Sequence, residues 1–343
     1  MVAAAGVAGP SRSESANCAR SAGDPGTSWV HDISASTARL PGRQKTNYAR
    51  CVLKLPPFAY LAPSTLDDAL SLLSDRGDEA RVLAGGQSLI PLLALRLARP
   101  ECLVDLGRLT ELVGIADHGP SVGIGAMTKE LMVERSAVVA AQLPLLAQAL
   151  SFIGHPAIRS RGTVGGSLAH ADPAAELPAA ALVLEAEMRV VSRDRGPRVI
   201  PAKDFFLGPF TTALASDEIL TEVRIPKQAP GSGFCFDEVA RRVGDFAVVG
   251  AAAAVQVQEG QLRGFRVTLT GVADRPILRT GVELGIGEDS VDSFSAAGQR
   301  LAQELNPPSD LHGSSEYRRH LVALLVPQVL GRAHQVALAG SAS

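Results

Sequence analysis

The spacing of apolar residues over residues 54–106 alternates between helical and extended periods. After the hydroxyl pair Ser64-Thr65, apolar residues recur at helical spacing and stop before Gly77, which predicts a capped amphipathic helix. Residues 81–84 and 102–106 are short apolar runs that predict strands. Ser88 is expected to begin a second helix between these strands. The leucines of this second helix expected to face the core are Leu89, Leu92, Leu93 and Leu97. The alternation predicts a small α/β unit over residues 54–106.

Residues 107–226 predict a second unit with more strands. Thr128 is expected to cap a helical stretch that continues to Phe152. Asp172-Pro173 is expected to begin a later helix, with the Asp as N-cap and the Pro at the first helical position. The expected strands cover residues 112–116, 121–125, 187–192 and 219–225, the first two joined as a hairpin by a turn at 117–120. Together with residues 54–106, this unit forms a predicted domain over residues 54–226.

A Pro-, Gly- and Ser-rich segment, residues 226–233, predicts a boundary before a C-terminal domain at residues 234–336. That domain is expected to contain three consecutive antiparallel strands followed by two helices. The strands cover residues 234–242, 246–257 and 261–272, and the helices cover residues 291–305 and 315–336. The whole chain therefore predicts an α+β fold.

Residues 1–53 differ from the rest, because they are rich in Ala, Ser, Gly and Arg and show no sustained period. This composition predicts a disordered N-terminal extension. The segment lacks the basic start and uninterrupted apolar stretch of a signal peptide. We expect the natural chain to start near Val52 or Leu53.

Two Gly-Gly pairs carry the candidate chemistry. Gly85-Gly86 and Gly165-Gly166 each follow a run with apolar residues that we interpret as a strand, and a serine comes shortly after each pair. A backbone without Cβ can approach a diphosphate closely and turn its N–H groups toward the oxygens. Folding could therefore close both segments on one nucleotide cofactor. The alternative for either segment alone is a tight turn in which glycine only relieves strain.

Charged residues near the second pair have two interpretations each. Arg159 and Arg161 could offset the charge of a diphosphate, or could form a solvated loop or a salt bridge. Asp172 is expected to act only as a helix cap, because a carboxylate beside a diphosphate would repel it. Glu176 could accept a hydrogen bond from a cofactor hydroxyl or amine, or lie on the surface.

Composition excludes several other functions. The chain has 343 residues, a formal net charge of −2 and only 4% aromatic residues, which argues against nucleic-acid binding. Its four cysteines show no C-x-x-C spacing, so we expect no metal or cluster held by this chain and a reducing, cytoplasmic location. No uninterrupted apolar run is long enough to predict a membrane span. P-loop, Rossmann and nucleophile-elbow motifs are absent, and no acid/base pair stands out. A cofactor cradle without such groups is typical of a redox carrier.

The motifs in this order closely resemble those of the FAD-binding medium subunit of molybdenum hydroxylases, such as aerobic carbon monoxide dehydrogenase and bacterial xanthine dehydrogenase. The segments that carry the resemblance lie at residues 84–91 (AGGQSLIP), 95–100 (LRLARP), 154–156 (GHP), 162–173 and 241–247 (RRVGDFA). The resemblance runs from Lys54 to about Leu330. It implies two α/β subdomains, 54–106 and 107–226, of the vanillyl-alcohol oxidase/p-cresol methylhydroxylase-type FAD-binding fold. It also implies a C-terminal domain with a three-stranded antiparallel sheet and helices.

The resemblance further implies which residues contact FAD. The two glycine segments carry over directly, and three separate positions carry over less directly. These residues are Gly85, Gly86, Gln87, Ser88, Leu89, Thr163, Val164, Gly165, Gly166 and Ser167, together with Ile153, Glu176 and Leu220. Some relatives have an FAD-contacting Lys where this chain has Glu238, so that contact is expected to be missing. No catalytic side chain is implied.

The resemblance implies an oxidoreductase subunit that works in a heterotrimer. Substrate would be oxidised on a large molybdopterin-binding subunit, and electrons would pass through a small 2Fe–2S subunit to the FAD held here. They would leave to NAD, a quinone or another acceptor. Two alternatives stay open: a stand-alone flavoprotein oxidoreductase acting on a small molecule, and a non-catalytic assembly protein that has lost the flavin.

Overall fold

The computed structural model describes residues 55–285 and 292–341. The predicted N-terminal extension, residues 1–53, and the expected start of the natural chain near Val52 or Leu53 lie outside these residues. Sheets of three, five and four strands and one two-stranded hairpin make up the β structure of the described residues.

A parallel three-stranded sheet in the order β1-β3-β2 builds the first unit. Its elements are β1 (Ala59–Leu61), α1 (Leu66–Arg76), β2 (Ala80–Leu83), α2 (Leu89–Ala94) and β3 (Cys102–Asp105). Helix α1 begins as predicted, because the Thr65 side chain accepts a hydrogen bond from the Asp68 N–H. Helix α2 differs from the prediction: only Leu93 is buried, and Leu97 lies beyond the helix end with 73% of its surface exposed.

The second unit contains an antiparallel sheet in the order β4-β5-β10-β6-β7. Its strands are β4 (Ile115–Asp117), β5 (Ser121–Gly125), β6 (Glu187–Ser192), β7 (Gly196–Pro201) and β10 (Glu218–Pro226), and a hairpin pairs β8 (Phe206–Gly208) with β9 (Thr211–Thr212). The helices are α3 (Glu130–Glu134), α4 (Ala137–Gln142), α5 (Pro144–Phe152), α6 (Pro156–Arg159), α7 (Val164–His170), α8 (Glu176–Val183) and α9 (Ala202–Phe205). The predicted hairpin and the strands at 187–192 and 219–225 are present, whereas the pattern missed β7, β8, β9 and α9.

Two helix starts were predicted wrongly. Thr128 caps no helix, because its hydroxyl hydrogen-bonds both the N–H and the carbonyl of Gly114. The expected long helix is three short ones, interrupted where Ser136 caps α4 and Pro144 begins α5. Asp172 does not cap α8 either. Its carboxylate accepts a hydrogen bond from the Ala174 N–H in a local turn, and α8 begins at Glu176.

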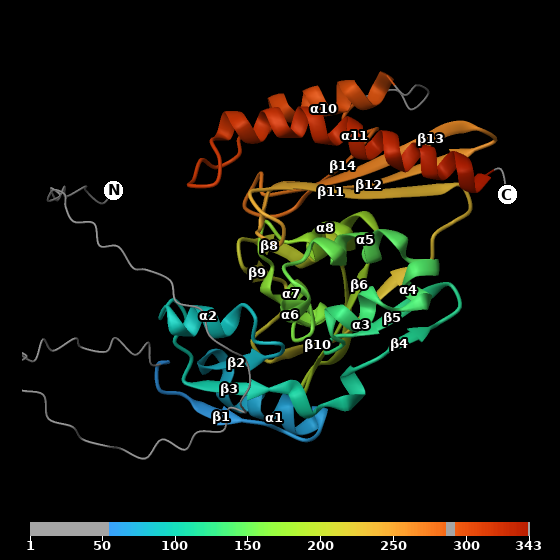
Figure 1. Ribbon diagram of the computed structural model, residues 1–343. Helices are drawn as coiled ribbons and strands as arrows, with labels where there is room; N and C mark the ends of the chain where they lie inside the picture. The colour runs from blue at the N-terminus through green and yellow to red at the C-terminus, as the bar shows by residue number, and fades with distance from the viewer. Residues whose placement is uncertain (1–54, 286–291, 342–343) are drawn as a thin grey trace, which may run out of the picture. The chain divides into compact units, whose positions relative to one another are not determined.

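The C-terminal sheet has four antiparallel strands, not the three that were predicted. They are β11 (Ser232–Ala240), β12 (Ala247–Gln258), β13 (Gln261–Thr270) and β14 (Ile277–Thr280), followed by α10 (Asp292–Glu304) and α11 (Ser315–Ser341). The fourth strand was missed because its four residues are too few to show a period. Figure 1 shows the sheet between two helical layers, with α10 and α11 on one face and α5 and α8 on the other.

Helix α8 lies in the centre of this arrangement. Every residue from Glu176 to Val183 is buried, which is typical of a helix surrounded by protein on all sides. The core around it joins helix and sheet residues of the second unit to Phe234, Phe236, Ala252 and Ala254 of the C-terminal sheet. A second core forms between that sheet and α10 and α11.

Helix α11 is long and apolar enough, by length and composition alone, to cross a membrane. However, 44% of its most apolar window is buried inside the protein. Its buried residues, including Val322, Val326 and Val329, belong to the second core. Within this fold, α11 therefore acts as a core helix.

Candidate functional site

The two glycine segments lie backbone against backbone. A Cβ atom placed on Gly85 would lie 2.3 Å from the carbonyl oxygen of Arg161 and 2.9 Å from the Cα of Gly162. A Cβ placed on Gly166 would lie 3.2 Å from the Cβ of Ala84. The fold thus brings together two segments that are 80 positions apart in the sequence. The expectation that they face one another is confirmed.

The first segment keeps its amides free. Among the described residues, no group accepts a hydrogen bond from any backbone N–H between Gly85 and Leu89. Gly86 has a φ of +73°, which a side chain would disfavour. The Ser88 side chain does not cap α2, and no described group hydrogen-bonds its hydroxyl. Five consecutive amides and one hydroxyl are therefore available to an anionic ligand.

The second segment uses its amides within the protein. It is the first turn of α7 and follows α6, so the expectation of a loop behind a strand is wrong here. Gly165 N–H donates to the Ala126 carbonyl, and Gly166 N–H donates to the Thr163 hydroxyl. Val164 and Ser167 N–H groups are also bonded within the protein. Within the described structure, the Ser167 hydroxyl and the Thr163 N–H are the polar groups of this segment left without a partner.

Packing explains part of the glycine pattern. A Cβ on Gly165 would lie 2.5 Å from the Cβ of Ala126, and one on Gly162 would lie 2.4 Å from a carboxylate oxygen of Glu130. Gly165 therefore requires glycine for close packing whether or not a cofactor is bound, because the obstacle is the backbone and Cβ of Ala126. At Gly162 the obstacle is the end of the flexible Glu130 side chain, which can move. The packing role of Gly165 differs from the alternative of a strained turn, because Gly165 does not have a positive φ.

Of the two interpretations left open for the arginines, the salt bridge is confirmed for Arg159. Arg159 is buried and binds Glu134 through two hydrogen bonds of 2.7 and 3.0 Å, and it also donates to the Ile153 carbonyl. Its charge is thus neutralised inside the fold. Arg161 is exposed, and the site uses its backbone carbonyl instead, which accepts a hydrogen bond of 3.1 Å from Lys129 Nζ.

Lys129 is the cation that the sequence did not reveal. It precedes α3, and residue 129 forms an isolated bridge with Thr163. Partial burial, followed by the charge of Arg161, lowers the pKa of Lys129. Nearby at the carboxyl ends of β1 and β3, Tyr60 donates a short hydrogen bond to Asp105. The signal that could have revealed Lys129 is its position directly after the turn that closes β5.

Three carboxyl groups with raised pKa values surround the second segment and α8. Burial, reinforced by Glu176, raises the pKa of Glu130 to about 8, and one of its carboxylate oxygens has no partner in the described structure. Burial raises the pKa of Glu176 to about 7 and that of Glu238 to about 8, with Glu176 adding to the effect on Glu238. Glu130 and Glu238 therefore hold protons at neutral pH, whereas Glu176 titrates close to it. Glu176 is buried, so the expectation that it might lie on the surface is wrong.

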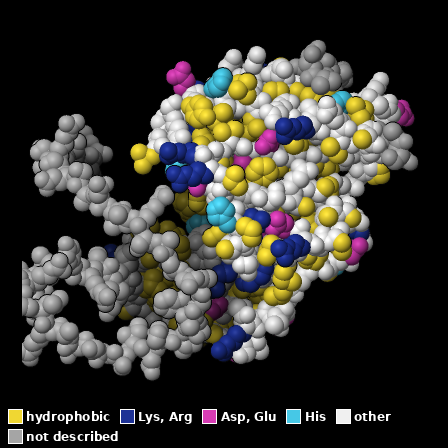
Figure 2. All heavy atoms as spheres, in the orientation of Figure 1, with side chains coloured by type: hydrophobic (Ala, Val, Ile, Leu, Met, Phe, Trp, Pro, Cys, Tyr) yellow, Lys and Arg dark blue, Asp and Glu magenta, His cyan; other side chains and the backbone are white. Residues whose placement is uncertain are grey.

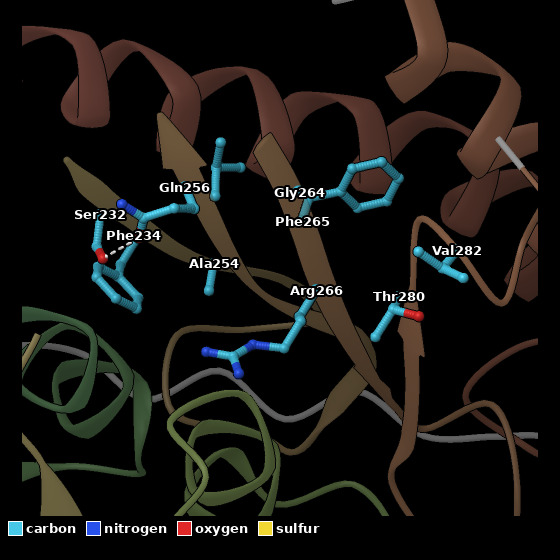
Figure 3. Close-up of a pocket in the computed structure, with 10 residues that line it drawn as sticks. Ser232, Phe234, Ala254, Gln256, Gly264, Phe265, Arg266, Thr280 and Val282 are labelled. Atoms are coloured by element: carbon cyan, nitrogen blue, oxygen red, sulfur yellow. Dashed lines mark hydrogen bonds between the residues drawn. The ribbon is translucent and has the colours of Figure 1, made fainter. Parts of the chain in front are cut away.

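Ile153 and Leu220 were implied as cofactor contacts, but their side chains pack with the core around α8. The Ile153 carbonyl is already bonded to Arg159, and Leu220 lies in β10 next to a bulge. A separate groove of about 410 Å³ lies on the C-terminal sheet, where Phe234, Gln256, Arg266 and Thr280 line it (Figure 3). It does not include the glycine segments. On the face drawn in Figure 2, basic and acidic side chains are interspersed.

Comparisons with known proteins identify the family. A family model described as "FAD binding domain in molybdopterin dehydrogenase" matches residues 56–228, and "CO dehydrogenase flavoprotein C-terminal domain" matches residues 234–333. The chain belongs to the FAD-binding medium subunits of molybdenum hydroxylases. This medium subunit is thus an FAD-binding oxidoreductase subunit of the carbon monoxide/xanthine dehydrogenase type.

Individual relatives match the medium subunit over nearly their full length. The 6-hydroxypseudooxynicotine dehydrogenase complex subunit alpha of Paenarthrobacter nicotinovorans is 39% identical over 82% of this chain and 96% of its own. The structure of carbon monoxide dehydrogenase from Hydrogenophaga pseudoflava has a TM-score of 0.79 at 36% identity, covering 82% of this chain and 98% of that one. The structure of quinoline 2-oxidoreductase from Pseudomonas putida 86 has a TM-score of 0.77 at 38% identity, covering 83% of this chain and 99% of that one.

Proposed function

We propose that this subunit holds FAD against its two glycine segments, takes electrons from iron–sulfur clusters of a partner subunit and passes them to an external acceptor. The observation that carries the proposal is the row of five amides from Gly85 to Leu89 that bond no described group and lie beside the second glycine segment. Amides, two free hydroxyls and the Lys129 ammonium form a donor set that fits a diphosphate. The two subdomains are proposed to form the vanillyl-alcohol oxidase/p-cresol methylhydroxylase-type fold.

The proposed contacts divide into three groups. The first segment supplies backbone amides, the second supplies Thr163 and Ser167 next to tightly packed glycines, and Lys129 supplies positive charge. Burial raises the pKa of Glu176 to about 7, so its protonated form can donate or accept a hydrogen bond to the cofactor without a charge. FAD supplies the electron-transfer chemistry when bound, and the protein residues bind and orient it.

The partners follow from the relatives, whose names describe subunits or medium chains of complexes. We propose a heterotrimer with a large molybdopterin-binding subunit and a small 2Fe–2S subunit, and NAD, a quinone or another molecule as acceptor. A cytoplasmic location is also proposed. Cys102 and Cys235 are free buried thiols, which is consistent with a reducing compartment.

The cofactor proposal is tested by removing the two free hydroxyls. A hydrogen bond to a charged group contributes about 1.5–3 kcal/mol, so Ser88→Ala and Ser167→Ala should each weaken FAD binding by roughly 10- to 150-fold. Ser151→Ala is the matched control, because Ser151 is exposed near the end of α5 and its hydroxyl bonds only the Gln148 carbonyl. Fluorescence titration with FAD measures the affinity of the three flavin-free variants and of the wild type. Unchanged affinity in both site variants would contradict the assigned cradle.

The electron-transfer proposal is tested in the assembled complex. Flavin reduction by substrate under anaerobic conditions should require both partner subunits, and omission of the iron–sulfur subunit should abolish it. If the isolated subunit instead oxidises a small molecule at a comparable rate, the stand-alone flavoprotein alternative is correct.

A further inference from the structure

A row of polar residues crosses the C-terminal sheet on the face that packs against α8. In the register of the strands, Glu238 of β11 lies opposite Gly250 of β12, which lies opposite Thr270 of β13. Residues directly opposite one another point to the same face of an antiparallel sheet. The next row on this face contains Phe236, which belongs to the core around α8, and ends at Thr268. Polar side chains therefore extend into this core.

These polar side chains lack partners. Thr268 and Thr270 are fully buried, yet no described group hydrogen-bonds either hydroxyl. One carboxyl oxygen of Glu238 is also buried without a partner in the described structure. A Cβ placed on Gly250 would lie 2.7 Å from the Thr270 hydroxyl oxygen and 3.5 Å from the Cβ of Glu238, so the glycine keeps a side chain out of the space between them. A buried polar group without a partner costs about 1–3 kcal/mol, and three on one face of one sheet require an explanation.

Helix α8 brings a second carboxyl group to this face. It packs on β12 and β13, and the Gly271 N–H at the end of β13 donates a hydrogen bond of 2.9 Å to the Pro173 carbonyl, just before the helix. Glu176, the first residue of α8, is buried. Its charge raises the pKa of Glu238 and of Glu130, so Glu176 lies near both carboxyl groups. We define the buried polar cluster as Glu176, Glu238, Thr268 and Thr270.

The charges that act on the two carboxyl groups of the cluster are negative. Asp172, in the turn before α8, raises the pKa of Glu176, and Asp237 of β11, itself paired with Arg332, raises that of Glu238. Neither Glu176 nor Glu238 forms an ion pair with a described cation. Burial and these charges therefore favour the protonated carboxyl group, which donates as well as accepts hydrogen bonds.

We propose that the buried polar cluster binds ordered water and forms a proton path from Glu238 to Glu176, which supplies the proton that flavin reduction takes up. Water fits the cluster because it donates and accepts hydrogen bonds, and a buried water molecule needs two to four polar partners. Glu238 is the outer end of the path, because it is only partly buried, and Glu176 is the inner end. This inference rests on the proposed function, because it assumes that FAD binds beside Glu176.

Each proton movement in this path leaves atoms and charge balanced. The iron–sulfur subunit of the proposed function supplies two electrons, and the flavin takes up one proton with them. The O–H bond of Glu176 breaks, and its proton bonds to the reduced flavin. The Glu176 carboxylate takes a proton from the cluster water, which takes the proton of Glu238. Solvent then reprotonates Glu238, so the cluster returns to its starting state.

The water is tested in the flavin-free protein with Thr270→Val, which removes the hydroxyl and nearly keeps the shape. In a dry core, loss of an unpartnered buried hydroxyl stabilises the protein, because the cost of desolvating it disappears. If water binds the hydroxyl, the variant should melt below the wild type. Thr128→Val is the reference for a bonded hydroxyl, because Thr128 is fully buried and bonds the Gly114 backbone. A melting temperature above the wild type for Thr270→Val would overturn the proposal.

The proton path is tested in the FAD-loaded full chain by fast photochemical reduction, with a pH-indicator dye reporting proton uptake from solvent. Glu238→Gln keeps the shape but has no proton to release, so uptake should slow at least tenfold at unchanged FAD content. Glu259→Gln is the matched control, because Glu259 is exposed in the turn between β12 and β13. Uptake at the wild-type rate in Glu238→Gln would refute the path alone, whereas a wild-type protein that takes up no FAD would refute the proposed function.

Discussion

The contact between the two glycine segments makes Gly85→Ala the most informative substitution. The added methyl group would lie 2.3 Å from the Arg161 carbonyl oxygen, whereas ordinary contacts begin at 3.4 Å. The obstacle is backbone on both sides, so neither a rotamer change nor a flexible side chain can relieve it. The two segments must therefore separate by about 1 Å, the difference between these distances.

Overpacking of this kind costs about 1–3 kcal/mol. The flavin-free protein can relax by letting the segments separate, but FAD binding needs them together and must then overcome the strain. If FAD binding has to overcome the whole overpacking energy of about 1–3 kcal/mol, the affinity for FAD falls by roughly 5- to 150-fold. In the flavin-free Gly85→Ala variant, the free energy of unfolding should therefore fall by less than the overpacking energy.

Isothermal titration of the flavin-free protein with FAD measures the effect directly. Gly208→Ala is the matched control, because a Cβ at Gly208 in β8 meets no atom within 4 Å. The control should bind FAD like the wild type. If Gly85→Ala binds FAD with wild-type affinity and also unfolds at the wild-type temperature, the packing argument is wrong and the segments do not act as one site.

Three further predictions concern stability. Burial raises the pKa of Glu130 from 4.5 to about 8, so between these pH values the folded protein holds a proton that the unfolded chain has released, and the free energy of unfolding should decrease as pH rises. Glu130→Gln should make this decrease less steep in thermal unfolding measured at several pH values. If the variant loses stability with pH as steeply as the wild type, the assignment of the raised pKa to Glu130 is wrong. Arg159→Met leaves the Glu134 carboxylate without its buried partner and should destabilise the protein by about 3–5 kcal/mol in chemical denaturation, whereas a loss below about 1 kcal/mol, typical of surface pairs, would show that Arg159 is solvated. Arg96→Gly relieves the left-handed backbone and should stabilise the isolated subunit by about 1 kcal/mol; a lower melting temperature would show that the Arg96 side chain contributes more than the strain it costs.

Elements with a clear period or a start signal were predictable from the sequence. The helix cap at Thr65 and the long C-terminal strands appear close to where the pattern put them. The predicted hairpin is also present, although its first strand covers 115–117 instead of 112–116. The errors occurred where one local signal competed with another. Thr128 has the right chemistry for a cap, but its hydroxyl is used by a distant backbone group, Gly114, which no local pattern reveals. Strand β14 is too short to show any alternation.

The candidate site was predictable in position but not in its polar detail. The glycine pairs identified both segments, because few other residues tolerate such close backbone approach. Which amides stay free depends on tertiary partners, such as the Ala126 carbonyl that takes the Gly165 N–H. The same holds for charge: the sequence left open whether Arg159 offsets a diphosphate or forms a salt bridge, and the fold pairs it with Glu134, whereas Lys129 reaches the Arg161 carbonyl beside the first glycine segment.

Helix α8 also decides how this subunit can be divided. Its fully buried surface touches helices α5, α7 and α9 before residue 226 and strands β12, β13 and β14 after it. Cutting the chain at residue 226 would therefore expose apolar core surface on each fragment. Separately expressed halves should then aggregate, and the intact subunit should melt in a single cooperative transition. Engineered exchange of C-terminal halves between relatives will succeed only if the residues that pack on α8 are exchanged with them.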